Sequence, residues 1–126
     1  MNWYLVAGGV ALAAIGLIHS VLGERRIFRR LRGASFIPTD GGSHLREPHV
    51  RILWATWHLA TALSWGLAAI LLWLALPSSQ PLAQSPIPAL IAAAVFASGG
   101  LVLIGTNDRH PGWIGLLGAA VLIWLA

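Results

Sequence analysis

Long apolar stretches alternate along this chain with short polar connections. Apolar residues dominate four segments and predict helices over about residues 3–23, 50–76, 87–106 and 111–126. A helix needs roughly 20 apolar residues to cross a bilayer core of ~30 Å; the first three segments reach that length, and the fourth falls somewhat short. We therefore expect an all-α integral membrane protein, a four-transmembrane-helix bundle that forms a single domain over residues 1–126.

Composition agrees with a membrane protein. Hydrophobic residues make up 57% of the chain and charged residues 10%, and the mean hydropathy is +0.76. The chain has no cysteine, which excludes disulfides and thiolate metal ligands. The pI of about 11.5 is compatible with a nucleic-acid partner. We expect none, because the basic residues cluster beside an apolar helix, where they set topology or contact lipid.

The distribution of arginine predicts the orientation in the membrane. Seven of the eight basic residues lie between Arg25 and Arg51, whereas the connection 77–86 has no charge. An excess of Lys and Arg marks the cytoplasmic side. We therefore expect the basic loop 24–51, with 24–49 as the connection proper, to be cytoplasmic, the loop 77–86 to lie outside, and both termini to lie outside. The first segment is expected to be a retained helix and not a signal peptide, because its arginines follow the apolar run.

Five arginines of this loop are expected to contact the anionic headgroups of the bilayer. They are Arg25, Arg26, Arg29, Arg30 and Arg32. The expected location is a bacterial cytoplasmic (inner) membrane.

Two helical faces are predicted to pack in the bundle interior. Small residues at helical spacing in the first segment let another helix approach closely; they are Gly9, Ala13, Gly16 and Ser20. One face of the second segment is too polar or too small to prefer lipid. It comprises Arg51, Trp54, His58, Thr61, Ala62 and Trp65.

Four of the five histidines are predicted to gather at the cytoplasmic end of the bundle. His19 ends the first segment, His49 and His58 begin the second, and His110 lies in the last turn; His44 lies in the loop. Ionisable residues within spans usually face a partner, a cavity or a pathway. Imidazole is also the commonest metal ligand, and facing helices of bundles build metal and haem sites.

The sequence thus predicts a histidine-centred polar site at the cytoplasmic membrane boundary. It would bind a transition metal or haem, or relay protons, with His19, His58, Glu24 and His49 as candidate metal ligands. Glu24 lies five residues after His19, off its helical face, and is better placed as an outer partner or in an ion pair with Arg51 or Arg109. The alternative is that each histidine simply bonds a backbone carbonyl or water.

The segment Arg109–Gly115 (RHPGWIG) resembles a signature R-H-P-x-Y-x-G. That signature occurs in membrane methyltransferases such as isoprenylcysteine carboxyl methyltransferase and phospholipid methyltransferases, and similar R-H-P segments occur in NnrU-like proteins. The resemblance implies that Arg109 and His110 contact a cofactor beside a helix start. It covers seven residues, with Trp113 in the place of Tyr. Those methyltransferases have further helices after the motif, so a complete S-adenosylmethionine site is not expected in one copy.

Two other functions remain open. A small homo-oligomeric transporter or channel would need a polar path across the membrane, and the third and fourth segments have almost no polar residue at mid-depth. An accessory or assembly subunit of a larger membrane complex would use the faces rich in Gly and Ala for docking. Homo-oligomerisation is compatible with each of these functions, and the sequence singles out no enzymatic activity.

Overall fold

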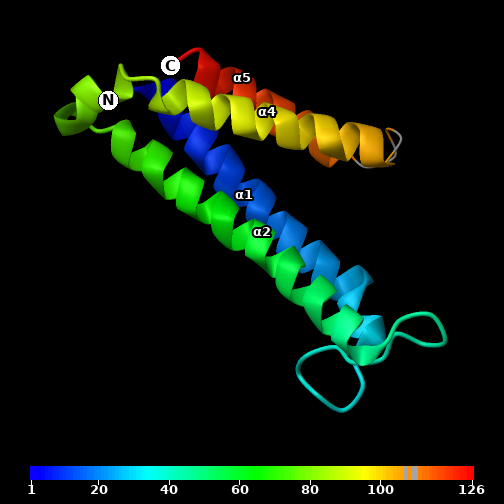
Figure 1. Ribbon diagram of the computed structural model, residues 1–126. Helices are drawn as coiled ribbons and strands as arrows, with labels where there is room; N and C mark the ends of the chain where they lie inside the picture. Colours follow the sequence, from blue (N-terminus) through cyan, green and yellow to red (C-terminus); the bar gives the residue numbers. More distant parts are fainter. Residues whose placement is uncertain (107, 109–110) are drawn as a thin grey trace. The chain divides into compact units, whose positions relative to one another are not determined.

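The protein is all-helical in a computed structural model that describes residues 1–106, 108 and 111–126 (Figure 1). The long helices are α1 (Trp3–Arg26), α2 (Glu47–Leu74), α4 (Ile87–Thr106) and α5 (Gly112–Trp124). The short elements are the 3₁₀ turns η1 (Phe28–Leu31) and η2 (Pro77–Ser79) and the single turn α3 (Gln80–Ala83). These ranges contain no β-strand. The prediction of an all-α fold is confirmed.

The helix boundaries differ from the prediction by a few residues. Helix α1 continues through Glu24 to Arg26, because arginine is a good helix former and basic groups in a last turn interact favourably with the helix dipole. Helix α2 begins at Glu47, where an acidic side chain and the following Pro48 both suit a first turn. The connection 77–86 contains η2 and α3, which the sequence analysis did not predict.

Three helices, α1, α2 and α4, are long and apolar enough to cross a membrane. Many of their large apolar side chains are exposed, including Leu101 and Ile104, which are 73% and 80% exposed. Helix α5 has 13 residues. At 1.5 Å per residue it is only ~20 Å long, which is less than the thickness of a bilayer core.

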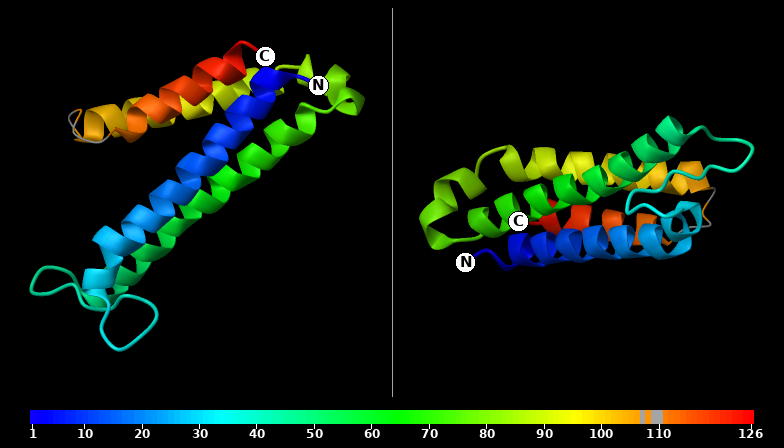
Figure 2. Two further views of the ribbon diagram at one scale, coloured as in Figure 1. Left: turned by 180° about the vertical axis from the view of Figure 1, so that it is seen from behind. Right: turned by 90° about the horizontal axis from the view of Figure 1, so that it is seen from below.

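The chain forms two compact units, each described here by itself. The core unit comprises residues 1–15 and 64–126, and the loop unit comprises residues 16–63. In the loop unit, the second half of α1 and the first half of α2 lie side by side and are joined by the segment 27–46 (Figures 1 and 2). The expectation of one transmembrane domain stays a prediction.

An apolar core holds the core unit together. Its fully or almost fully buried side chains come from α1, α2, α4 and α5, and include Leu5, Leu12, Leu71, Leu74, Ala119 and Ile123. The two chain ends meet here, because the Asn2 side-chain amide donates to the carbonyl of Ala126 at 2.9 Å. The Asn2 backbone N–H donates to the carbonyl of Ala75 at 3.0 Å. The start of α1 and the ends of α2 and α5 therefore lie together.

The predicted small-residue face of α1 lies against α2 within each unit. In the core unit, a Cβ on Gly9 would meet the Ala68 carbonyl at 3.1 Å, and the Ala13 carbonyl accepts a bond from the Trp65 indole at 3.1 Å. In the loop unit, the Gly16 carbonyl accepts a bond from the Thr61 hydroxyl at 3.2 Å. Small residues thus let α2 side chains reach the α1 backbone, as is common between membrane helices.

Candidate functional site

The candidate site lies in the loop unit, where α1 ends and α2 begins. Ser20 and Glu24 are four residues apart on α1, and Trp54 and His58 are four residues apart on α2, so each pair lies on one helical face. Arg32, which directly follows η1, completes the group. Both helices and the chain that joins them thus contribute polar side chains to one place.

His58 is held on both of its ring nitrogens. Its Nδ1 lies 2.6 Å from the Ser20 hydroxyl oxygen, and its Nε2 lies 3.5 Å from Oε2 of Glu24. The second distance is longer than an ordinary hydrogen bond and still short enough for direct electrostatic attraction. The edge of the Trp54 ring packs against the imidazole, with centroids 5.0 Å apart. The orientation of His58 is therefore fixed by partners from both helices.

Glu24 is the acceptor on which three side chains converge. It accepts a hydrogen bond from Arg32 Nη2, and Oε2 accepts one from the Trp54 indole at 3.3 Å. The third side chain is that of His58. The predicted ion pair with Arg51 is wrong: Arg51 pairs with Glu47 one turn away, at 2.7 Å, and the cationic partner of Glu24 is Arg32. Arg32 can reach Glu24 because the turn at η1 returns the chain toward α1.

His19 has a different environment from His58. Its ring stacks on Trp57, with centroids 4.3 Å apart and planes 8° from parallel, and its carbonyl accepts a bond from the Trp57 indole at 3.1 Å. His49 is exposed in the first turn of α2. Among the described residues, no group of three or more His, Cys, Asp or Glu side chains could hold a metal ion. The predicted set of metal ligands is thus not supported as one cluster.

Two further candidates cannot be placed. Arg109 and His110, to which the methyltransferase resemblance assigned cofactor contacts, lie outside the described residues. The predicted contacts of these two residues stay predictions.

A pocket of about 270 Å³ opens beside this cluster; we call it the Glu24 pocket. Its lining residues are Glu24, Arg32, Phe36, Trp54 and His58. The guanidinium of Arg32 lies 5.1 Å from the centre of the Phe36 ring, which is a cation–π contact. The Arg32 Nε–H is buried and meets no acceptor in the parts of the chain that the structure describes. The pocket thus combines an ion pair, an imidazole and two aromatic walls.

Sequence reasoning missed Ser20, Arg32 and Trp54 as members of the site. The signal for Ser20 and Trp54 was the four-residue spacing to Glu24 and to His58, which places each pair on one face only if α1 continues past residue 23. No local pattern singles out Arg32 from its basic neighbours, because its position depends on the turn at η1.

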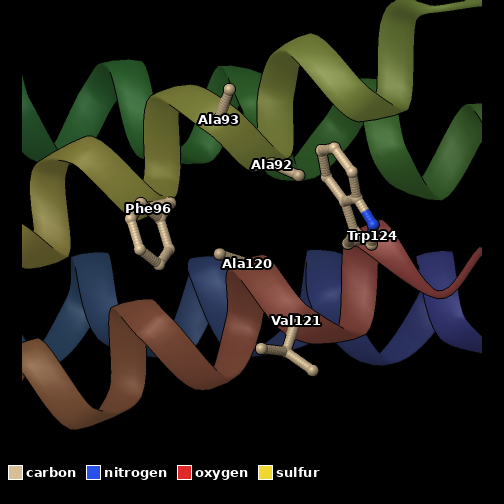
Figure 3. A pocket seen from close by; sticks show the side chains of 6 residues that line it. All are labelled: Ala92, Ala93, Phe96, Ala120, Val121 and Trp124. Atoms are coloured by element: carbon tan, nitrogen blue, oxygen red, sulfur yellow. The ribbon is translucent and has the colours of Figure 1, made fainter.

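A second pocket, in the core unit, is apolar. It has a volume of about 410 Å³ and lies between α4 and α5. Figure 3 shows the rings of Phe96 and Trp124 extending into the space between the two helices, beside Ala92 and Ala120. None of its lining side chains is ionisable, so this pocket has no group for acid–base chemistry or for binding a metal ion.

The chain was compared with protein-family models, with curated proteins and with solved structures, and nothing matched. The seven-residue resemblance around His110 therefore stays local, and the interpretation of the site depends on its geometry.

Proposed function

We propose that this is an integral membrane protein with its arginine-rich segment 24–51 on the cytoplasmic side of a bacterial inner membrane. The proposal is supported by three helices of spanning length, by the charge difference between this segment and the loop 77–86, and by the meeting of both chain ends at Asn2 and Ala126. Ends that meet favour an even number of crossings. The short α5 then makes the fourth crossing where the bilayer thins locally.

We infer that the function of the site is proton exchange by His58 at this boundary. The carrying observation is that Ser20, His58 and Glu24 form a continuous chain of groups. An ionised carboxylate only accepts, so Glu24 favours a proton on Nε2; the Ser20 hydroxyl then donates to Nδ1. A proton taken up at Nδ1 gives an imidazolium that Glu24 stabilises, and the hydroxyl of Ser20 turns to accept. Loss of that proton restores the neutral ring.

Proton exchange fits the site better than metal or haem ligation does. Both nitrogens of His58 already face partners suited to proton transfer, and the ring of His19 stacks on Trp57. The cluster offers only His58 and Glu24 as donors of the kind that transition metals prefer. Structural zinc sites, for comparison, need four such ligands.

The exchange is proposed to serve one face of the membrane and not a path through it. Residues 66–74 of α2 (GLAAILLWL) contain no ionisable side chain. Protons that reach His58 therefore pass to a substrate or partner at the boundary. The exposed Arg25, Arg26, Arg29 and Arg30 are proposed to contact anionic headgroups and to hold this end of the protein at the membrane surface.

Infrared difference spectroscopy after a change of bulk pH tests this function on the protein in bilayers. We expect imidazole and carboxylate bands to change together and reversibly. His58→Gln should remove the His58 contribution to the imidazole bands together with the carboxylate shift coupled to it, and Glu24→Gln should remove that carboxylate shift, while the bands of the other four histidines stay. His44→Gln is the control, because His44 is exposed in the loop and bonds only its neighbour Ser43 among the contacts described. Spectra unchanged by His58→Gln would contradict the proposal.

The rival functions give different results in companion measurements. Stoichiometric metal or a haem absorption band, lost in both His19→Ala and His58→Ala, would favour the metal site. Ion flux in liposomes would favour a transporter. A protein that gives no coupled infrared bands and copurifies with a membrane complex would favour an accessory subunit.

A further inference from the structure

We infer that the Glu24 pocket binds the phosphate oxyanion of a phosphodiester, as in a phospholipid headgroup. The inference rests on the proposed position of this end of the protein at the membrane surface, and it does not depend on proton exchange by His58. It begins with Arg32, a wall of the pocket whose donors are only partly used.

The first step concerns hydrogen bonding. A guanidinium has five N–H donors, and Arg32 donates from Nη2 to Glu24. The Nε–H is buried and has no acceptor among the residues of the described ranges. Leaving such a donor unpaired is unfavourable. The Arg32 side chain as a whole is 26% exposed, and a small rotation that uncovers Nε would let an oxyanion bond Nε and Nη side by side. Phosphate oxygens have the geometry for this two-point contact.

The second step concerns charge. Arg32 and Glu24 neutralise each other, so the pocket supplies no surplus positive charge, and the Glu24 carboxylate repels an anion of one charge less than an anion of two. A phosphodiester carries one charge, whereas a phosphomonoester carries ~1.5 to 2 at neutral pH. The exposed Arg25, Arg26, Arg29 and Arg30 on the same stretch of chain attract an anion toward this surface. Ligand charge and local field therefore agree for a monoanionic phosphate.

The third step concerns the rest of the ligand. Phe36 lines the pocket and is 76% exposed, and its ring also packs edge-on against Trp54, with centroids 6.2 Å apart. An exposed aromatic side chain beside a phosphate-binding arginine provides an apolar surface for the glycerol and the first methylenes of a lipid. A free phosphate ester would use the arginine alone. The two sources are thus separable by experiment.

Isothermal titration of the full-length protein in a neutral detergent tests the inference. The lipid probe is dihexanoyl phosphatidylglycerol, and the free anion probe is inorganic phosphate. Arg32→Lys keeps the positive charge beside Glu24 but removes Nε–H, and should weaken binding of the lipid probe about tenfold or more. The matched control Arg29→Lys, on the exposed side of η1, should change it by less than about twofold.

Further variants separate the possible outcomes. Phe36→Ser leaves Arg32 intact. It should weaken binding of the lipid probe while leaving the binding of inorganic phosphate unchanged. This variant tests the pocket even if Arg32→Lys does not fold. Equal binding of inorganic phosphate and lipid supports the oxyanion site and assigns it to a free anion. Equal effects of Arg32→Lys and Arg29→Lys, or no binding of either probe, overturn the inference. Binding is measured independently of the infrared signal, so absence of the coupled infrared bands together with intact binding of the lipid probe contradicts only the proton-exchange proposal.

Discussion

The indole ring of Trp57 lies against the imidazole ring of His19, with centroids 4.3 Å apart and planes 8° from parallel. The same indole donates its N–H to the carbonyl of His19 at 3.1 Å. One side chain of α2 thereby contacts both the side chain and the backbone of one residue of α1, which fixes the register of the two helices in the loop unit. Because His58 and Ser20 are the next residues along each helix, this register also brings them together.

The register depends on Gly23, over which the Trp57 ring packs. A Cβ at Gly23 would overlap Nε1 of Trp57. Gly23→Ala should therefore displace the indole and lower the free energy of unfolding by about 1–3 kcal/mol, measured by denaturant titration in micelles. The control Gly66→Ala, also within a helix, meets no atom within 4 Å and should be neutral or slightly stabilising. Equal stability of the two variants would contradict the packing described.

The hydroxyl of Thr61 is a second contact between the helices. Thr61 is 5% exposed and donates to the carbonyl of Gly16 at 3.2 Å. Thr61→Val keeps the shape and loses the bond, and should cost about 0.5–1.5 kcal/mol of unfolding free energy. Thr56→Val is the matched control, because Thr56 is exposed and bonds the carbonyl of Ile52 in its own helix. A cost for Thr56→Val as large as that for Thr61→Val would be inconsistent with an interhelical role.

Removing the charge of Glu24 should loosen the segment that follows α1. Arg32 then loses its ion pair, and the bonds from the amides of Thr39 and Asp40 to the carbonyl of Leu31 should open more often. We expect hydrogen exchange at these two amides to accelerate about fivefold in Glu24→Gln, which corresponds to roughly 1 kcal/mol.

Glu47→Gln is the comparison for this measurement. It removes an exposed pair with Arg51, whose side chains are 46% and 54% exposed, and such pairs contribute little. The prediction fails if both variants exchange alike at residues 39 and 40.

The absence of cysteine makes the proposed topology directly measurable. Ser43→Cys lies in the arginine-rich segment and Ser78→Cys in the uncharged connection, and both positions are exposed. In sealed inner-membrane vesicles with the cytoplasmic face outward, a membrane-impermeant maleimide should label residue 43 and leave residue 78 unlabelled. Intact spheroplasts should give the reverse. Labelling of both positions from one side would contradict the topology.

The fold was largely predictable from the sequence because its main signal is the length and apolar character of each segment. Four long helices follow from that signal alone. The ends of the helices were harder to predict, because charged residues such as Arg25 and Arg26 can lie either in the last turn of a helix or in the loop that follows it. The small face of α1 was predicted correctly, since Gly16 and Ser20 recur at helical spacing and backbone approach needs small side chains.

The site was predicted in part. The sequence identified His58 and Glu24 as important polar residues, but not that they would face each other, because ending the helix at residue 23 places Glu24 in a loop. Three more helical residues put Glu24 one turn below Ser20 and within reach of His58. The position of Arg32 depends on how the chain turns at η1, which no periodicity in the sequence encodes.

The central claim is that His58 is held between the Ser20 hydroxyl and the Glu24 carboxylate. Nitrogen NMR of isotope-labelled histidine in bilayers measures this directly, with His58→Gln to assign the ring signals. For the neutral ring we predict a protonated Nε2 and a hydrogen-bonded, unprotonated Nδ1. Ser20→Ala should shift the Nδ1 resonance, and Glu24→Gln should raise the population of the other tautomer. A neutral ring protonated mainly on Nδ1, and insensitive to both substitutions, would contradict the account.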